Sequence, residues 1–430
     1  MVKTEYYKDL TKMNTFGMKV KARCFMEYDS VADLVDIEFE ELARPVLHIG
    51  GGSNLLFTDD FKGTVLHSKI NFIEILDEVV EGDEPSSRHC EERSDVAISN
   101  VLVSVGAGVV FDDFCEWAAK EGLWGVENLS YIPGEVGASA VQNIGAYGVE
   151  VKDVIRTVYC YDTVEEEFVN FDVSECEYGY RDSIFKRPEI KGRYIVTHVV
   201  FALSRTPQPK LEYGHLRAAV SEVAGISCDP RLPDGRHPLA GGGMSPEIPA
   251  TSDTSHKVTP MVIRKTIIRI RKEKLPDPSV MGSAGSFFKN PVISAEHFAK
   301  IEAAAKVEHG PYYKVPHYIV ECQCVPEAPS QAGLGPSPYP GVGKCLLHTN
   351  GISTPSEAPA VKVPAAWLIE QCGWKGRRSG GAAVWDKQPL VIVNYTGEAY
   401  PEEIIGLEKR IIASVKTKFG IELHPEVDHI

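Results

Sequence analysis

The sequence lacks any apolar run that approaches the roughly 20 residues a helix needs to cross a bilayer. Residues 1–10 are polar and charged, without the apolar stretch of a secretion signal. Its 10 cysteines are scattered over 430 residues and do not have the dense spacing of a small disulfide scaffold. These absences predict a cytoplasmic protein whose thiols are reduced.

A long basic run is also missing, and the formal net charge is −15. Generic nucleic-acid binding is therefore not expected, and neither is a membrane partner. A single pocket on an acidic protein can still be positive, so a small molecule that carries phosphate groups is compatible with this charge. The hydrophobic share of 43% and the charged share of 24% lie near the averages of soluble globular proteins.

Strand and helix patterns are both present along the chain, which predicts an α+β protein of more than one domain. Helical spacing of apolar residues is expected in 109–121, 261–273, 295–308 and 401–419, and strands in 100–105, 155–161 and 194–203. The last of these helices begins with Pro401 and ends before Gly420, the usual start and stop signals.

Three segments break the pattern. Residues 78–99 are charged and without periodicity, whereas 226–259 and 321–363 are rich in Pro, Gly and Ser. Segments of this composition do not bury enough apolar surface to offset the entropy of ordering. We expect them to be long insertions on the surface.

Two glycine-rich loops are the first candidate binding elements. Residues 50–54 read GGGSN directly after a short apolar run, and successive backbone N–H groups in such a loop can converge on an anion. Neither a GxGxxG fingerprint nor a P-loop lysine is present. In residues 132–148, IPGEVGASAVQNIGAYG, small residues permit close backbone approach to a ligand, and Gln142 and Asn143 add polar groups. A tight turn and a plain glycine-rich connection are the alternatives.

Six blocks in order carry a resemblance to a known family. GGGSNLLF (50–57) and IPGEVGASAVQNIGAYG are followed by CEYGYRDSIFK (176–186), LPDPSVMGSAGSFFKNP (275–291), AAWLIEQCGWKG (365–376) and HPEV (424–427). Together they resemble the UDP-N-acetylenolpyruvoylglucosamine reductase (MurB) family, in the type whose tyrosine-bearing loop covers the substrate. The blocks span most of the chain outside the three insertions.

The resemblance implies an α+β architecture, in which a two-part FAD-binding region of the vanillyl-alcohol-oxidase/PCMH type is joined to a separate α+β substrate-binding domain. The FAD-binding parts are expected at 1–75 and 76–225, with 420–430 returning near the site. The substrate-binding domain is expected at 260–419, after the inserted loop 226–259.

The implied reaction is the NADPH-dependent, FAD-dependent reduction of UDP-N-acetylglucosamine enolpyruvate to UDP-N-acetylmuramate, a step of peptidoglycan precursor synthesis. The substrate is thus a small molecule, and the cofactors are FAD and NADPH. The residues that the resemblance assigns to cofactor binding are Gly50, Gly51, Gly52, Ser53, Asn54, Pro133, Gly134, Gly137, Ala138, Gln142, Asn143, Gly145, Ala146 and Tyr147.

Reduction of an enol ether needs a hydride donor, stabilisation of an enolate-like carboxylate and a proton donor to the α-carbon. Arg181 offers a permanent cation whose fork matches a carboxylate. The resemblance assigns the proton to Ser286, with Ser283 as a nearby alternative, and places Glu426 beside the substrate carboxylate. Without the resemblance, a surface ion pair, a helix cap and a solvated tail would be the ordinary interpretations of these three residues.

Substrate contacts are implied for Tyr213, as the residue of the covering loop, and for Lys274, Asn290 and Gln371; Arg271 is a weaker candidate. Tyr213 could also be an ordinary core aromatic. One departure is Asp428, since the family commonly has a basic residue soon after the PEV sequence.

Three other interpretations stay open. Cys322, Cys324, Cys345 and His348 could bind zinc, although the spacing is atypical and no metal is expected; His89 with Cys90 has fewer soft ligands still. An oxidase on the same flavin scaffold is a second possibility, and a flavin-free binding protein is a third.

Overall fold

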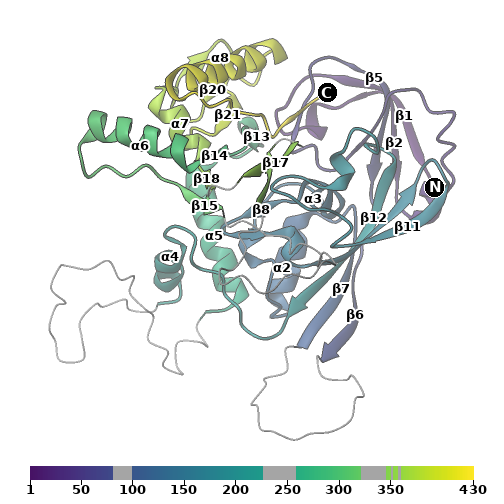
Figure 1. Ribbon diagram of the computed structural model, residues 1–430. Helices are drawn as coiled ribbons and strands as arrows, with labels where there is room; N and C mark the ends of the chain where they lie inside the picture. The colour runs from purple at the N-terminus through teal and green to yellow at the C-terminus, as the bar shows by residue number, and fades with distance from the viewer. Residues whose placement is uncertain (81–98, 226–257, 321–344, 350–351, 357–359) are drawn as a thin grey trace, which may run out of the picture. The chain divides into compact units, whose positions relative to one another are not determined.

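The computed structural model describes residues 1–80, 99–225, 258–320, 345–349, 352–356 and 360–430 (Figure 1). The central parts of the three predicted insertions lie outside these residues. The chain divides into two compact units. The first contains residues 1–14, 19–53 and 59–274, and the second contains 15–18, 54–58 and 275–430.

The first unit begins with a four-stranded sheet of order β1-β2-β5-β3. Its strands are β1 (Lys3–Asp9), β2 (Lys21–Tyr28), β3 (Val46–Ile49) and β5 (Phe61–Ser68), and β5 is parallel to both of its neighbours. The short helix α1 (Val31–Val35) starts at Ser30, whose side chain accepts a bond from the backbone of Asp33. Leu34 of this helix is fully buried in one cluster with Tyr28 and Leu66 of the sheet.

A five-stranded antiparallel sheet of order β11-β10-β12-β7-β6 completes the strands of this unit. The strands are β6 (Ile73–Val80), β7 (Ser99–Gly106), β10 (Ile155–Asp162), β11 (Glu167–Asp172) and β12 (Tyr194–Ser204), with the short pair β8 (Gly145–Ala146) and β9 (Val149–Glu150) apart from them. Val101, Val103 and Val105 of β7 are fully buried in the core of this unit, and Ser104 between them is buried as well.

α3 (Val136–Gln142) packs on β12 and β7 of this second sheet, and Phe114 of α2 (Phe111–Lys120) contacts Phe201 of β12. Two further helices, α4 (Leu216–Val223) and α5 (Pro260–Lys274), follow in the chain (Figure 1). α5 contacts both α2 and α4. Arg264 on α5 pairs with Asp112 on α2, with one bond of 3.0 Å, so a charged contact fixes the two helices together. The short helices η1 (Thr11–Met13), η2 (Glu127–Leu129), η3 (Val151–Asp153) and η4 (Ile184–Lys186) connect these elements.

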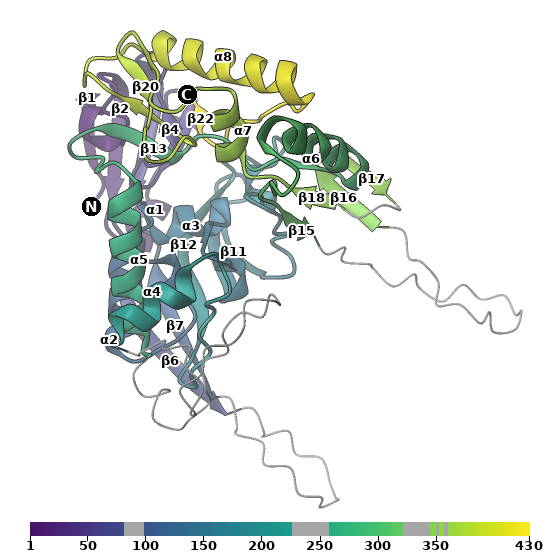
Figure 2. The same cartoon turned by 90° about the vertical axis from the view of Figure 1, so that its left-hand side faces the viewer.

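The second unit is built on an antiparallel sheet of order β13-β21-β20-β19. These strands are β13 (Gly282–Ser286), β19 (Arg378–Ser379), β20 (Ala382–Val384) and β21 (Val391–Asn394), and α8 (Pro401–Phe419) lies against β20 and β21 (Figure 2). α7 (Ala365–Gln371) packs on α8. α8 has Pro401 in its first turn and ends at Gly420, which has φ of 68°, as its sequence predicts.

Smaller sheets complete the second unit. β14 (Val292–Ser294), β18 (Ala360–Lys362) and β15 (Tyr318–Val320) form one, which α6 (Ala295–His309) contacts; β16 (Cys345–Thr349) and β17 (Ile352–Ser356) form a hairpin. β4 (Leu55–Leu56) pairs in parallel with β22 (Asp428–His429), so residues from both ends of the chain share this unit.

The four predicted helices and three predicted strands are all present, with ends that differ by one or two residues. Several elements fall across the expected boundaries. β6 contains residue 78, where an insertion was expected to begin, and β16 and β17 lie within the expected insertion 321–363. Ala360–Lys362, expected to end an insertion, forms β18, which is central in its sheet. The expected boundary at residue 75 falls inside β6. α5, expected to begin the substrate-binding domain, groups with the first unit because it packs on α2 and α4.

Candidate active site

The first glycine loop follows β3 and is in tight contact with the second loop. A Cβ added to Gly51 would stand 3.4 Å from the Cα of Gly134, and one added to Gly50 would stand 3.1 Å from the Cβ of Ala138. The hydroxyl of Ser53 donates to the carbonyl of Pro133 at 3.1 Å. The two sequence blocks are thus brought together within the first unit, as the resemblance implies.

Glycine is required at Gly52 for two reasons. Its φ is 62°, and a Cβ would lie 1.9 Å from the carbonyl oxygen of Met13. Gly137 is also close to its neighbour, since a Cβ there would lie 2.9 Å from the Cβ of Ala107. The loops therefore form a cradle walled by backbone and small side chains, which fits the close approach of a flavin dinucleotide.

Asn143 ends α3 in the left-handed conformation and is completely buried. Its Nδ2 donates to Gly179 O at 2.7 Å and to Glu150 Oε2 at 3.1 Å, while its Oδ1 accepts from Lys152 N at 3.3 Å. The side chain of Asn143 is therefore a brace of the loop. Any contact of Asn143 with the cofactor has to use its backbone.

Arg181 lies beside the same loop, in a left-handed backbone conformation with φ of 56°. Its guanidinium donates to Asn143 O at 3.2 Å and to Gly145 O. The carbonyl of Arg181 in turn accepts a bond from Lys186, whose Nζ also reaches Gln142 Oε1 at 2.8 Å. The predicted substrate ligand thus contacts the predicted cofactor loop directly, and the strained backbone is of the kind that clusters at functional sites.

Tyr213 contacts the end of the second loop. Its ring lies 5.9 Å from that of Tyr147 in an edge-to-face arrangement, and its Cβ is 3.7 Å from where a Cβ on Gly148 would stand. Asn128 holds the two segments, since its Nδ2 donates to Tyr147 O at 3.0 Å and to Lys210 O at 2.8 Å. The 40% exposure of Tyr213 favours the covering-loop interpretation over an ordinary core aromatic.

Arg271 makes contacts close to the second glycine loop that its sequence did not reveal. Its Nε donates to Tyr131 O at 3.1 Å, and its guanidinium also contacts the hydroxyl of Tyr147. Burial lowers the pKa of this arginine, although the nearby Tyr147 opposes the shift. A half-buried cation beside Tyr147 is suited to an anionic ligand. From the sequence, Arg271 was the weaker candidate because it could equally lie on the solvated face of its helix.

Ser286 and Glu426 lie on neighbouring backbone segments of the second unit. Glu426 N donates to Phe287 O at 2.8 Å, and Lys289 N donates to His424 O at 2.9 Å. Ser286 is exposed, whereas Ser283 is only 3% exposed and its N–H is bonded to Thr15 O. This difference favours Ser286 over Ser283 as the proton donor.

Two residues that the resemblance assigned to ligand binding use their side chains to hold the backbone of the second unit. Asn54, expected to bind cofactor, donates from Nδ2 to the carbonyl of Glu426 at 3.0 Å. Asn290, expected to bind substrate, accepts at Oδ1 from Ala365 N at 2.9 Å, and thereby caps the start of α7. Asp428, the departure from the family pattern, lies in β22 and pairs with Leu55.

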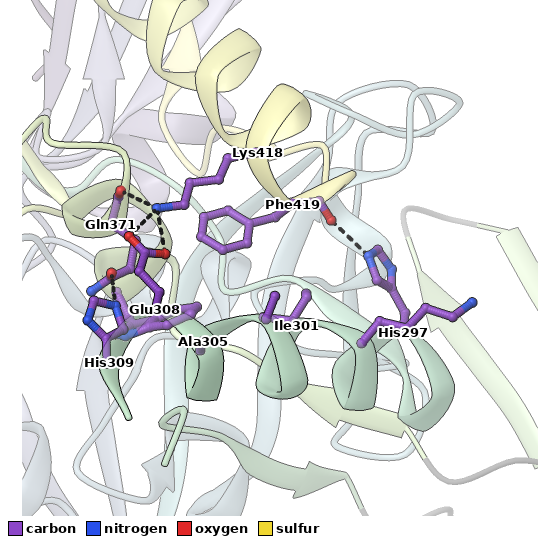
Figure 3. Close-up of a pocket in the computed structure, with 11 residues that line it drawn as sticks. His297, Ile301, Ala305, Glu308, His309, Gln371, Lys418 and Phe419 are labelled. Carbon is purple, nitrogen blue, oxygen red and sulfur yellow. Dashed lines mark hydrogen bonds and ion pairs between the residues drawn. The ribbon is translucent and has the colours of Figure 1, made fainter. Parts of the chain in front are cut away.

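Gln371 lines a hollow of about 240 Å³ between α6 and the ends of α7 and α8 (Figure 3). Its Oε1 faces His309 Nε2 at 3.0 Å, and its carbonyl accepts from Lys418 at 3.0 Å. Phe419 and Ile301 form the apolar wall of this hollow. Ser286 and Glu426 are not among its lining residues, so the substrate role of Gln371 rests on the resemblance alone, as that of Lys274 does.

Sequence reasoning missed His67 and Glu135. His67 is on β5 and Glu135 precedes α3, and their side chains meet at 2.9 Å between Nε2 and Oε1. Nothing local in the sequence pairs them. The only available signal was a charged residue, Glu135, inside a loop of otherwise small and apolar residues.

Among the residues the structure describes, no group of three or more His, Cys, Asp or Glu is arranged to hold a metal ion. Cys322, Cys324, His89 and Cys90 lie outside those residues, as do the side chains of Cys345 and His348. Across the described helices, none combines the length and the apolar character that a membrane span requires.

Two family models match the chain, and they fit the two units. Residues 23–166 match an FAD-binding domain. Residues 277–430 match the C-terminal domain of UDP-N-acetylenolpyruvoylglucosamine reductase. The loops and the two matches together define a flavoprotein oxidoreductase with a specialised C-terminal domain.

Curated relatives identify which oxidoreductases these are. The UDP-N-acetylenolpyruvoylglucosamine reductase of Bacteroides fragilis (strain YCH46) is 42% identical over 422 residues, covering 98% of each chain. That of Porphyromonas gingivalis (strain ATCC 33277) is 37% identical over 426 residues, with 98% of this chain and 97% of the relative covered. This chain belongs to the UDP-N-acetylenolpyruvoylglucosamine reductase family.

A solved structure agrees on the fold. The crystal structure of UDP-N-acetylenolpyruvylglucosamine reductase (MurB) from Thermus caldophilus matches with a TM-score of 0.53 at 19% identity, covering 100% of this chain and 98% of that one. With the family matches, this confirms the predicted family, the α+β fold with its FAD-binding region, and FAD as the cofactor.

Proposed function

We propose that this chain catalyses the NADPH-dependent reduction of UDP-N-acetylglucosamine enolpyruvate to UDP-N-acetylmuramate, in peptidoglycan precursor synthesis. The observation that carries the proposal is the contact of the two glycine loops, in which Gly51 faces Gly134 and Ser53 is bonded to Pro133. Such a cradle of backbone and small side chains suits a flavin dinucleotide, and the family match supplies the substrate. The UDP-sugar and NADPH are both cytoplasmic small molecules, and the cytoplasm is the proposed compartment.

The residues that would hold FAD are those of the two loops. Gly50–Ser53 would contribute backbone N–H groups to the diphosphate, and 133–138 with 145–147 would hold the flavin. When bound, FAD supplies the hydride chemistry that links NADPH to the enolpyruvyl group. Gln142 and Asn143 act through their bonds to Lys186, Glu150 and Gly179, which fix the shape of the second loop.

Arg181 binds the carboxylate of the enolpyruvyl group. Its backbone and its bonds to the second loop pre-orient the guanidinium, which is the condition for stabilising charge that develops only during the reaction. Its permanent charge and planar fork suit a carboxylate better than lysine would.

Ser286 donates the proton to the α-carbon. Serine is a weak acid, but the acceptor is an enolate-like carbon, which is strongly basic. The strand pairing of Ser286 with Val391 fixes its backbone while its side chain stays exposed, and the bond from Glu426 N to Phe287 O holds Glu426 on the neighbouring segment. Glu426 is assigned to the substrate carboxylate.

Tyr213 and Arg271 bind the diphosphate of the UDP-sugar. Both contact Tyr147, so an exposed aromatic and a half-buried cation lie next to the same loop. Lys274, Asn290 and Gln371 are assigned to the remainder of the substrate, with Asn290 donating from its Nδ2 because its Oδ1 already accepts from Ala365 N.

The test uses the purified protein. The expected results are bound flavin visible by absorbance and NADPH oxidation that depends on the UDP-enolpyruvyl sugar. Ser286→Ala should still take hydride from NADPH in a single turnover and fail to complete the cycle. Oxygen consumption with sugar alcohols, without turnover of the enolpyruvyl sugar, would instead indicate the oxidase. A colourless protein that does not take up FAD would indicate the flavin-free alternative.

A further inference from the structure

A buried histidine next to the glycine loops has a carboxylate on both sides. His67 lies near the end of β5 and is 4% exposed. Its Nδ1 is 3.1 Å from Glu27 Oε2, and its Nε2 is 2.9 Å from Glu135 Oε1. Glu27 is the direct neighbour of His67 in the pairing of β2 with β5, whereas Glu135 comes from the loop before α3.

His67 can donate a hydrogen bond to both carboxylates only when its imidazole is protonated. A neutral imidazole has one N–H donor and one lone pair, so one of its nitrogens would face a carboxylate oxygen without a hydrogen between them. The imidazolium donates to both carboxylates. Burial by itself lowers the pKa of His67, but the contacts with Glu135 and then Glu27 outweigh it and raise the pKa above its usual value.

The other titratable neighbours of His67 do not take over this role. His48, on the adjacent β3, is 2.7 Å from the hydroxyl of Tyr28 through its Nε2. Burial, followed by the charge of His67, lowers the pKa of His48 to about 4, so His48 is neutral near pH 7. Burial raises the pKa of Tyr28, which therefore keeps its proton. The charge of the cluster thus changes at His67.

Glu135 connects this histidine to both glycine loops. Although Glu135 is at the N-cap position of α3, its side chain makes no capping bond. Its Oε2 instead lies 3.3 Å from where a Cβ on Gly50 would stand, next to the first loop. Its backbone belongs to the second loop. One carboxylate therefore links the segment 133–138 to β5 and lies next to residue 50 of the first loop.

We propose that His67 and Glu135 are positioning residues for FAD, whose charged bridge holds the loops 50–53 and 133–138 in the arrangement that binds the cofactor and whose loss of a proton weakens FAD binding. This inference rests on the proposed function, since it takes these loops to be the FAD site. The sign follows from His67: the bridge is complete below its raised pKa and is lost as the pH rises through it.

The experiment measures FAD binding by the full-length protein after removal of flavin, using the quenching of flavin fluorescence from about pH 6 to about pH 9, the range in which a histidine near carboxylates titrates. The Kd of the wild type should rise about tenfold or more across this range, as expected for loss of one charge-assisted bond. Unfolding temperatures at each pH show that the protein remains folded.

Three variants separate the bridge from a general effect. Glu135→Gln should bind FAD about tenfold more weakly at the acidic end and lose most of the pH dependence. Glu27→Gln keeps the link to the loop, so its affinity at the acidic end should match the wild type while the weakening begins at lower pH. His198→Gln is the matched control, because His198 is a half-buried histidine of β12 that stacks on Tyr159 at 4.3 Å.

A wild-type Kd that does not change with pH overturns the proposal, and so does a folded Glu135→Gln protein with the affinity and pH profile of the wild type. Equal effects of Glu135→Gln and His198→Gln would also overturn it. A wild type that binds no FAD at all would contradict both the proposed function and this inference. FAD binding that does not depend on pH would contradict only the positioning role of His67 and Glu135.

Discussion

The two regions that carry the predicted functional residues are fixed by different means. In the first unit, side chains hold the glycine loops: Ser53 bonds to Pro133, Asn143 to Gly179, and Arg181 to the carbonyls of Asn143 and Gly145. In the second unit, backbone pairing holds the segment of Ser286, backbone pairing and the Nδ2 of Asn54 hold that of Glu426, and the side chain of Ser286 is exposed. Substitutions in the first region should therefore disturb binding and stability together, while those at Ser286 should disturb chemistry alone.

Ser286→Ala is the substitution with the largest expected effect, and it tests whether a change in the second unit disturbs chemistry alone. Loss of a positioned proton donor should reduce kcat about 10²- to 10⁴-fold. Reduction of bound flavin by NADPH and the unfolding temperature should match the wild type, since backbone pairs hold this strand. Stopped-flow absorbance separates the two half-reactions, with Ser283→Ala as the neighbouring control. Equal loss of both half-reactions would contradict the assignment.

Gly52→Ala tests the glycine loops of the first unit, where binding and stability should change together. The added Cβ meets the carbonyl oxygen of Met13 and the φ is positive, so we expect about 3 kcal/mol or more of destabilisation together with lost FAD binding. Gly192→Ala is the matched control, because Gly192 also has positive φ but a Cβ there meets nothing within 4 Å. It should cost about 1 kcal/mol. Denaturant unfolding measures both, and equal values would argue against the close contact.

Arg181→Lys should affect binding and chemistry at once. Lysine keeps the charge and loses the fork, so we expect kcat/KM to fall about 10- to 100-fold, as for loss of oriented charge stabilisation. The carbonyls of Asn143 and Gly145 in the second loop would lose their bonds to the guanidinium of Arg181, so the Kd of FAD should rise as well. Steady-state kinetics with flavin titration checks this. Unchanged FAD affinity would show that Arg181 is not a brace of the loop.

Asn290→Ala has the smallest expected effect. Removing the acceptor for Ala365 N should cost about 1 kcal/mol, as for other helix N-terminal caps. Asn290→Asp keeps an acceptor and should restore most of that stability. Thermal unfolding of the two variants measures the difference. If KM for the UDP-sugar rises in both variants while stability is kept in the aspartate, the predicted substrate contact outweighs the cap.

The sequence was sufficient to predict features in which the local backbone conformation requires a particular residue type. The glycines at 50–52 reveal a loop of close backbone approach, and Pro401 and Gly420 mark the two ends of α8. The choice of Ser286 came from a motif and agrees with its exposure. Such features depend on neighbours in the chain or on a pattern with a fixed order.

Features that depend on distant partners were not predictable in this way. His67 and Glu135 are 68 positions apart, and neither has a local pattern that points to the other. β18 is only three residues long and was hidden at the end of a Pro- and Gly-rich segment, although Val361 and Val363 are buried. For Asn143, the polar side chain indicated a ligand, whereas burial directs every one of its bonds to the protein.

The parallel pairing of β4 with β22 has a consequence for protein engineering. The second unit consists of three separate stretches of chain, and Thr58 N bonds to Ile430 O at 2.8 Å across 372 positions. A gene fragment that begins at Leu275 would encode a protein without the partner strand of its own terminus and without the carbonyl that receives the Ser283 N–H. A single crossover therefore cannot exchange this unit between relatives, and a graft has to carry residues 15–18 and 54–58 along with it.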